Sequence, residues 1–247
     1  MRLYALVVNH FLRMYDYRSS QTIDKFIFNS EEIRKRSLKF YKKDGIVIHP
    51  PIKTNKQSAI NKKQEEDYYP PGVALRAVPT PYYLTVSRLA PTKHIDLLIR
   101  VANKMKLKLK IVGTGNEEKY LRSIAGDTIE FIGTVNDEEL TKLYAGAKAF
   151  LYASLNEDFG MVPVEAMSYG TPVIALESGG VKETVIDGKT GIAFAELNVS
   201  SLENAIQRFE KLDKNSLLNM KNNAKEFANS CSEENFIKKL QASIIDN

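Results

Sequence analysis

The sequence is poor in the features that mark disulfide-linked, secreted and membrane-spanning proteins. Cys231 is the only cysteine among 247 residues, so no disulfide can form within the chain. No stretch approaches the run of about eighteen apolar residues that spans a bilayer. The opening MRLYALVVNHFLRMYD also lacks the pattern of a signal peptide. These absences favour a soluble protein in the cytoplasm.

Several catalytic signatures are absent as well. The three histidines, His10, His49 and His94, are far apart and have no accompanying set of cysteines, which argues against a zinc site. No D-x-D pair occurs, and the acidic cluster at 65–67 lies in a polar stretch typical of a solvated loop. There is no G-x-S-x-G elbow and no G-x-x-x-x-G-K-[ST] loop. We therefore expect no metal site, no cofactor, and neither a serine hydrolase nor a P-loop NTPase.

The composition is that of a globular protein, with 43% hydrophobic and 26% charged residues. The length is generous for one domain and short for two. The net charge of +5 is uneven, because residues 1–80 hold 15 Lys and Arg against 8 Asp and Glu, whereas residues 81–247 hold 20 against 22. The basic N-terminal part could face nucleic acid, anionic lipid or a phosphorylated substrate, or could be ordinary solvated surface.

From Tyr82 onward, short apolar runs alternate with helical periods, which predicts a doubly wound α/β domain with a parallel sheet. The expected strands are 82–87, 107–113, 128–133, 149–154, 171–176 and 190–195. The expected helix faces are Ile95, Leu98, Ile99 and Ala102; Leu140, Leu143, Tyr144 and Ala147; and Leu202, Ala205, Ile206 and Phe209. The pairs Asn136 with Glu139 and Ser200 with Glu203 have the spacing of capping boxes.

The first eighty residues predict only a partial unit. A helix is expected at 9–20, a strand at 25–29, a basic helix at 30–43 and a strand at 45–51. Residues 53–69 are polar and have no period, so they predict a linker or a surface loop. At the other end, 232–245 predicts an amphipathic helix.

The stretch NEDFGMVPVEAMSYG, at 156–170, is the most informative in the chain. Glu165 lies on a largely apolar helix, where a carboxylate needs a protein partner or a ligand hydroxyl. Glu157 precedes that helix, at the carboxyl edge of the sheet where open α/β sheets bind ligands. Gly160 lets the backbone pass close to a ligand, and the free N–H groups of Met161 and Val162 favour an anion such as diphosphate. The alternative is an ordinary, partly exposed helix.

A second group of candidates follows the first two strands. Arg88 and Lys93 can face one anion beside a helix N-terminus, where they would bind diphosphate and stabilise a leaving group, although a solvated pair is the alternative. Gly113 and Gly115 can bring backbone N–H groups near a ligand, but a plain strand-to-helix turn would use the same glycines. Gly179–Gly180 is ambiguous in the same way.

These motifs together resemble the donor-binding domain of retaining family 4 glycosyltransferases. The resemblance rests on RLAPTK at 88–93, the G-x-G after the second strand, EDFGMVPVE at 157–165, YGTPVIA and SGGVKETV. The glutamates separated by seven residues match the family's E-x7-E motif, and the match runs from about Tyr82 to Glu210. The sequence looks most like the mannosyltransferases of this family.

The resemblance implies a two-domain GT-B architecture of which most of the first domain is absent. Residues 1–52 would be a remnant of the N-terminal acceptor domain, 53–80 an interdomain linker, 81–230 the nucleotide-sugar donor-binding domain, and 231–247 a helix crossing back toward the N-terminal part. Such a helix would leave its apolar face exposed without the first domain.

The resemblance also assigns roles. Arg88 and Lys93 would neutralise the donor's diphosphate, Glu157 would bind the sugar hydroxyls and Glu165 the ribose hydroxyls. The donor would further contact Gly113, Gly115, Val135, Asp137, Phe159, Gly160, Met161 and Val162. Asp137 could accept hydrogen bonds from guanine, which favours GDP-mannose, whereas helix capping by Asn136 and Asp137 is the plainer alternative. His94 departs from the family, because many relatives have glycine there.

The implied reaction is metal-independent transfer of a hexose, with retention, to a glycan or lipid-linked acceptor in polysaccharide or glycolipid synthesis. The alternative is a nucleotide-sugar-binding module without turnover, because half of the cleft would be missing. We expect no nucleic-acid partner. Contact of the basic N-terminal part with the cytoplasmic membrane face is an open alternative.

Overall fold

The computed structural model describes residues 2–52 and 81–245. The predicted linker at 53–80 lies outside the described residues. Within the described ranges, no helix combines the length and the apolar character needed to cross a membrane.

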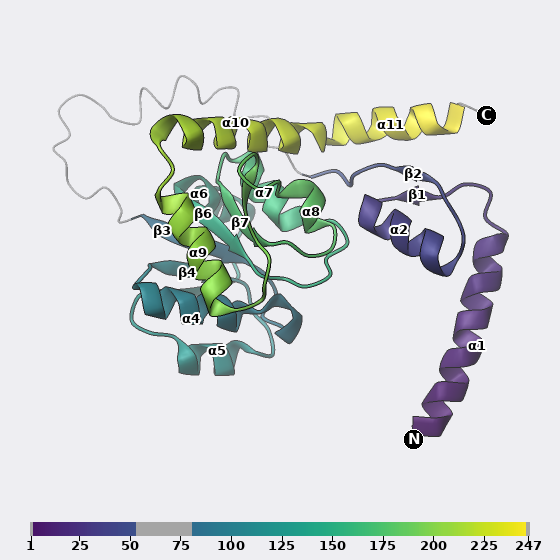
Figure 1. Cartoon of the computed structure of the whole chain (residues 1–247), viewed down its shortest axis with the longest axis horizontal. Coiled ribbons are helices and arrows are strands. Elements are labelled where there is room, and N and C mark those ends of the chain that lie inside the picture. Colours follow the sequence, from purple (N-terminus) through teal and green to yellow (C-terminus); the bar gives the residue numbers. More distant parts are fainter. Residues whose placement is uncertain (1, 53–80, 246–247) are drawn as a thin grey trace.

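The larger part of the chain is built on a parallel sheet of six strands (Figure 1). They are β3 (Tyr82–Val86), β4 (Leu109–Val112), β5 (Ile129–Gly133), β6 (Ala147–Tyr152), β7 (Val173–Leu176) and β8 (Gly191–Phe194). Their order across the sheet is β5-β4-β3-β6-β7-β8, and every neighbouring pair is parallel. All six predicted strands are confirmed, although β6 begins two residues earlier than expected.

Helices cover both faces of this sheet, which confirms the doubly wound α/β fold. One face carries α4 (Ile95–Met105), α5 (Glu118–Ile124) and α9 (Val199–Glu210). The other carries α6 (Asp137–Gly146), α7 (Met161–Ser168), α8 (Val181–Thr184) and α10 (Lys214–Ser230). The predicted apolar faces of α4 and α9 are fully buried, since each of their named residues is at most 4% exposed. A short 3₁₀ turn, η2 (Pro91–Lys93), precedes α4.

The structure tests both predicted capping boxes. The Asn136–Glu139 capping box is confirmed, with both reciprocal hydrogen bonds in place. The Ser200–Glu203 box is wrong, because Asn198 has the extended backbone of a cap and accepts from the N–H of Ser201 at 2.8 Å, so α9 begins two residues earlier than a Ser200 cap would place it. Glu203 instead pairs with Lys104 at 2.5 Å.

Ala147 was expected on the face of α6, but that helix ends at Gly146. Ala147 has extended backbone (φ −77°, ψ 139°) and starts β6 directly, so no loop separates the two elements. The predicted apolar pattern of α6 therefore continues into the strand, and Tyr144 is its fully buried member.

The N-terminal part contains α1 (Arg2–Gln21), β1 (Ile27–Phe28), α2 (Glu31–Phe40) and β2 (Ile46–Val47), with β1 and β2 parallel. Helix α1 extends away from the remainder of the molecule, and α11 (Glu233–Ile245) continues along the line of α10 (Figure 1). The Lys25 ammonium donates to the carbonyl of Ser243 on α11, and the N–H of Ile52 donates to the carbonyl of Cys231 at 2.9 Å. The C-terminal helix thus contacts the N-terminal part.

Candidate functional site

The strand order places a switch point between β3 and β6. From β3 the chain proceeds outward through β4 to β5, and it then returns to β6 on the other side of β3. Loops that leave the carboxyl ends of these two strands diverge, and open α/β sheets bind ligands in the resulting crevice. The loop after β3 carries Arg88 and Lys93, and the loop after β6 carries Glu157. The strand order therefore gathers the predicted catalytic residues at one edge.

Lys93 and Glu157 are in direct contact at this edge. The Lys93 ammonium donates to Glu157 Oε1, and the two side chains are 27% and 23% exposed. The Ser154 hydroxyl donates to the same oxygen. Burial by itself would raise the pKa of the Glu157 carboxyl, but the hydrogen bonds from Lys93 and Ser154 outweigh it and hold that pKa below its ordinary value. Glu157 is therefore a carboxylate at neutral pH, with an ammonium beside it.

Arg88 lies two residues beyond the end of β3, and its side chain is exposed. Within the described ranges it forms no ion pair with an acidic side chain, so its guanidinium remains available to an anion. Lys93 closes the short turn η2 and does not open α4, which starts at Ile95. His94, between them, has a left-handed backbone with φ of 48°, a conformation that glycine adopts without strain.

Gly113 and Gly115 have a packing role in this edge. A Cβ at Gly113 would lie 2.0 Å from the Ser87 carbonyl oxygen, and one at Gly115 would lie 2.2 Å from the Leu89 carbonyl oxygen. The N–H of Leu89 also donates to the carbonyl of Thr114 at 2.9 Å. The G-x-G turn thus lets the loop after β4 pack against the loop that carries Arg88. Direct contact with a donor stays a prediction.

The loop from Glu157 to Gly160 enters α7 through a left-handed glycine, Gly160, with φ of 83°. The Phe159 side chain is 2% exposed and packs in the core on the α7 face of the sheet. Met161 is 43% exposed and Val162 is partly buried at the first turn of α7. Pro163 lies in that first turn, as expected, where it removes no helical hydrogen bond.

Glu165 is half-buried on α7, near a buried tyrosine. Its Oε2 lies 3.5 Å from the Tyr144 hydroxyl, and the Tyr144 ring stacks on Tyr169 with a centroid separation of 5.3 Å. Burial, with a smaller contribution from the Glu165 charge, raises the pKa of Tyr144 well above its ordinary value, so the hydroxyl stays protonated. The sequence predicted a protein partner or a ligand hydroxyl for the Glu165 carboxylate, and the Tyr144 hydroxyl is such a protein partner.

Val135 and Asp137 flank the start of α6, after β5. Val135 is partly buried, and Asp137 is exposed as the first residue of the helix. Asn136 supplies the cap, which leaves the Asp137 carboxylate outside the capping box. Its place at the edge is compatible with base recognition, which stays a prediction.

Sequence reasoning missed three side chains that bear on this site. Arg36 on α2 bonds Asp158, the ring of His49 lies against Phe159, and Glu183 on α8 contacts both α2 and His49. A Cβ on Gly180 would lie 2.0 Å from the Asp158 carbonyl oxygen. The sequence signal for these contacts was the pair Gly179–Gly180, because adjacent glycines allow another backbone to pass close by.

Comparison with known proteins identifies the family of this chain. The profile of the family described as "Glycosyl transferases group 1" matches residues 74–227. A GDP-mannose-dependent alpha-mannosyltransferase from Mycobacterium tuberculosis is 37% identical over 107 residues, which cover 43% of this chain and 28% of the relative. A glycogen synthase from Desulfitobacterium hafniense is 34% identical over 149 residues, which cover 55% of this chain and 32% of the relative.

A solved Anabaena structure in complex with UDP and glucose shares the fold, with a TM-score of 0.70 and 22% identity over 90% of this chain and 63% of that one. The match to the two curated relatives spans about a third of their length or less. Because the family profile matches well over half of this sequence, the chain belongs to the group 1 glycosyltransferases.

Proposed function

We propose that this chain forms the donor side of an enzyme that transfers a hexose, mannose by preference, from a nucleotide sugar to an acceptor hydroxyl with retention at the anomeric carbon. The observation that supports this most directly is the contact of Lys93 with Glu157 at the switch point, with the exposed Arg88 guanidinium on the same loop. Two cations suit a diphosphate, and a carboxylate beside them suits sugar hydroxyls.

In the proposed reaction the acceptor oxygen bonds to the anomeric carbon while the bond from that carbon to the diphosphate oxygen breaks. The acceptor proton passes to the departing phosphate, which leaves as the nucleoside diphosphate. Arg88 and Lys93 would stabilise the charge that develops on this leaving group, as preorganised cations do. Their role would make a metal unnecessary, so activity in the presence of EDTA should be retained.

Two carboxylates would orient the donor. Glu157 would accept hydrogen bonds from the sugar hydroxyls and Glu165 from the ribose hydroxyls, while the N-terminus of α7 would face the phosphates. Asp137 would recognise the guanine N1 and N2 groups, because a carboxylate can accept from both. The mannosyltransferase relatives support a GDP-sugar, whereas the glycogen synthase relatives leave other donors open.

Calorimetry with GDP-mannose, UDP-glucose and UDP-N-acetylglucosamine tests the donor assignment, followed by an assay for release of free sugar. We expect the tightest binding for GDP-mannose. Binding without turnover would support a nucleotide-sugar-binding module in place of a complete transferase. Failure to bind any of the three donors would overturn the proposal.

Lys93→Ala is the single substitution that tests the proposed function most directly. Loss of one charge-assisted hydrogen bond should weaken donor binding roughly tenfold to hundredfold, and in a complete enzyme turnover should fall at least about a hundredfold. Lys104→Ala is the matched control, because Lys104 also pairs with a glutamate, Glu203, but does so between α4 and α9. Equal effects of the two substitutions would contradict the role of Lys93.

The acceptor would be a glycan or a lipid-linked saccharide at the cytoplasmic membrane face. The net charge of +7 over residues 1–80 and the exposed apolar side chains of α1, including Tyr4, Phe11 and Tyr15, support contact with anionic lipid. Co-sedimentation with anionic vesicles tests this contact, and equal binding to neutral vesicles would argue against it.

A further inference from the structure

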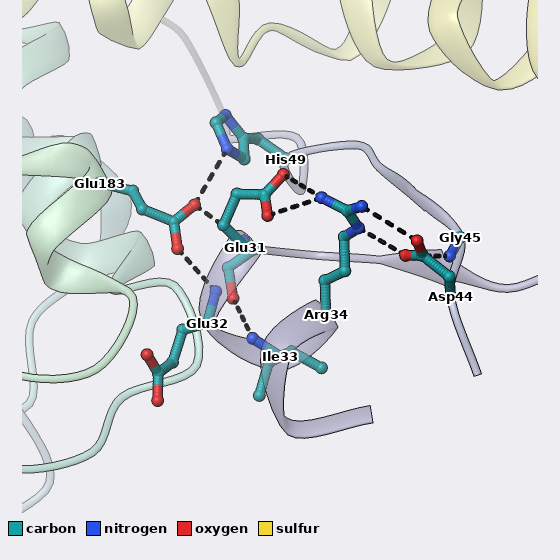
Figure 2. A network of polar contacts seen from close by, with 9 residues as sticks. Glu31, Glu32, Ile33, Arg34, Asp44, Gly45, His49 and Glu183 are labelled. Atoms are coloured by element: carbon teal, nitrogen blue, oxygen red, sulfur yellow. Dashed lines mark hydrogen bonds and ion pairs between the residues drawn. The ribbon is translucent and has the colours of Figure 1, made fainter. Parts of the chain in front are cut away.

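The donor loop, defined as residues 157–160, is connected to α2 through a carboxylate on α8. Glu183 accepts hydrogen bonds from the backbone N–H groups of Glu31 and Glu32, each at 2.9 Å (Figure 2). The Ser30 hydroxyl accepts the next free N–H of α2, that of Ile33. A side chain about 150 positions away in the sequence thus caps the first turn of this helix, where a negative charge is favourable.

His49 lies between this cap and the donor loop. Its Nε2 is 3.6 Å from Glu183 Oε2, and its ring lies on Phe159 with a centroid separation of 4.8 Å and an interplanar angle of 32°. Phe227 on α10 packs on the ring as well, at 6.1 Å. One imidazole therefore touches the cap on one side and the donor loop on the other.

Two further contacts complete a closed ring. Arg36, on the second turn of α2, donates from Nη1 to Asp158 Oδ1 at 3.3 Å, so α2 reaches the donor loop directly. On the opposite side, the N–H of Gly180 donates to the Glu157 carbonyl at 2.7 Å, and α8 with Glu183 follows immediately. The donor loop therefore contacts α2 through Arg36 and the start of α8 through Gly180, and α8 contacts α2 through Glu183.

We infer that Arg36, His49 and Glu183 are positioning residues that hold the donor loop, and with it the Glu157 carboxylate, in the geometry for binding a nucleotide sugar. The inference rests on the proposed function for its ligand. It gives residues 26–52 a part in the donor site, even though none of the predicted site residues lies there. A displacement of a catalytic group by about 1 Å is enough to lower activity strongly.

The charged groups that face His49 come from three elements. Glu183 on α8 and Glu31 on α2 are acidic, and Lys239 on α11 is basic. Burial and the charge of Lys239 lower the pKa of His49, and together they outweigh the two glutamates, which raise it. Acidification therefore places a charge on a partly buried ring that also faces Lys239, and donor binding should weaken as the pH falls from 7 to 5.

Hydrogen exchange of the amides at 157–160, measured by mass spectrometry, tests the inference without a ligand. Arg36→Gln and Glu183→Gln should each speed this exchange roughly two- to fivefold, as expected for loss of one partly exposed charged contact. Lys39→Gln is the matched control, because Lys39 is an exposed cation on the same helix and its ammonium lies over the Phe40 ring, 5.2 Å from the centroid. Arg36→Lys should restore most of the protection.

Calorimetry with the nucleotide sugar that binds best gives the second readout. Arg36→Gln and Glu183→Gln should weaken donor binding roughly two- to fivefold. His49→Phe loses the contact with Glu183 but keeps an aromatic ring on Phe159, so it should weaken binding at pH 7 by roughly twofold and lose the decline toward pH 5. Unchanged exchange and unchanged affinity in both glutamine variants would overturn the inference. If the wild-type chain bound no nucleotide sugar, the proposed function would fail, and the exchange data alone would still decide whether these residues hold the loop.

Discussion

The sheet part of the chain and its N-terminal part differ in how completely they bury their apolar side chains. In the sheet part, Leu98 and Ile99 on α4 are 0% exposed, and two clusters of buried residues fill both faces of the sheet. On α1, Tyr4 is 76% and Phe11 is 64% exposed. The difference teaches that the helices on the sheet bury their apolar side chains within the same part of the chain, whereas α1 leaves large apolar side chains exposed.

The largest expected effect is on stability, from equivalent leucine substitutions in the two parts. Leu98→Ala should lower the free energy of unfolding by about 2–5 kcal/mol, because it leaves a cavity in a core that cannot collapse fully. Leu12→Ala, at a side chain that is 58% exposed, should change it by less than about 0.5 kcal/mol. Urea unfolding of both variants measures this, and similar losses would show that α1 is buried in solution.

An intermediate effect is expected inside the sheet part, where Gly180 packs against the donor loop that Arg36 of the N-terminal part contacts. Gly180→Ala would set a methyl group 2.0 Å from the Asp158 carbonyl oxygen, so the loop must shift. We expect a loss of about 1–3 kcal/mol in the free energy of unfolding and donor binding weakened roughly tenfold or more.

Gly188→Ala is the control for this substitution. Its Cβ would meet nothing within 4 Å, although its φ of +72° makes alanine unfavourable there by about 1–2 kcal/mol. It should therefore lose stability but keep its donor affinity. Equal donor affinity in the two alanine variants would argue that Gly180 does not support the loop.

The smallest effect concerns the pH dependence of stability, through His49 in the N-terminal part. Burial lowers the folded-state pKa of His49 below its ordinary value of 6.5, so between these two values the unfolded chain binds more protons. The contribution of His49 to stability is therefore fully present above pH 6.5 and is lost as the pH falls through the folded-state pKa. Thermal unfolding followed between pH 7 and 5 should show a declining midpoint.

His49→Phe should flatten this decline while keeping an aromatic ring on Phe159. Hydrogen bonds hold the pKa values of Glu157 and Glu210 below their ordinary value, so these two carboxylates titrate mainly below the pH range of this measurement. A variant with the same pH dependence as the wild type would show that the decline has another origin.

Most of the sheet part could be predicted from sequence because its signals are local. Alternating apolar runs gave six strands in the right places, and the faces of α4 and α9 followed from helical periodicity. The errors occurred where two local signals compete. Ser200 and Asn198 are both acceptable caps, and the structure uses Asn198, whose side chain accepts from the N–H of Ser201.

The candidate site could be predicted in part. Motif spacing and the rule for parallel sheets were enough to expect Arg88, Lys93 and Glu157 at one edge, and their loops do meet at the switch point. The contacts of Glu183 with α2 and of His49 with Phe159 could not be predicted, since they join residues more than a hundred positions apart and no sequence pattern encodes the pairing.

The sequence by itself determined the fold class, the family and the residue types of the donor edge, because each depends on periodicity or on motifs read over short distances. The tertiary structure alone decided that Lys93 pairs with Glu157, that Gly113 and Gly115 let two loops pack together, and that Arg36 and His49 contact the donor loop. Those outcomes depend on how distant segments pack, and packing is fixed only when the whole chain has folded.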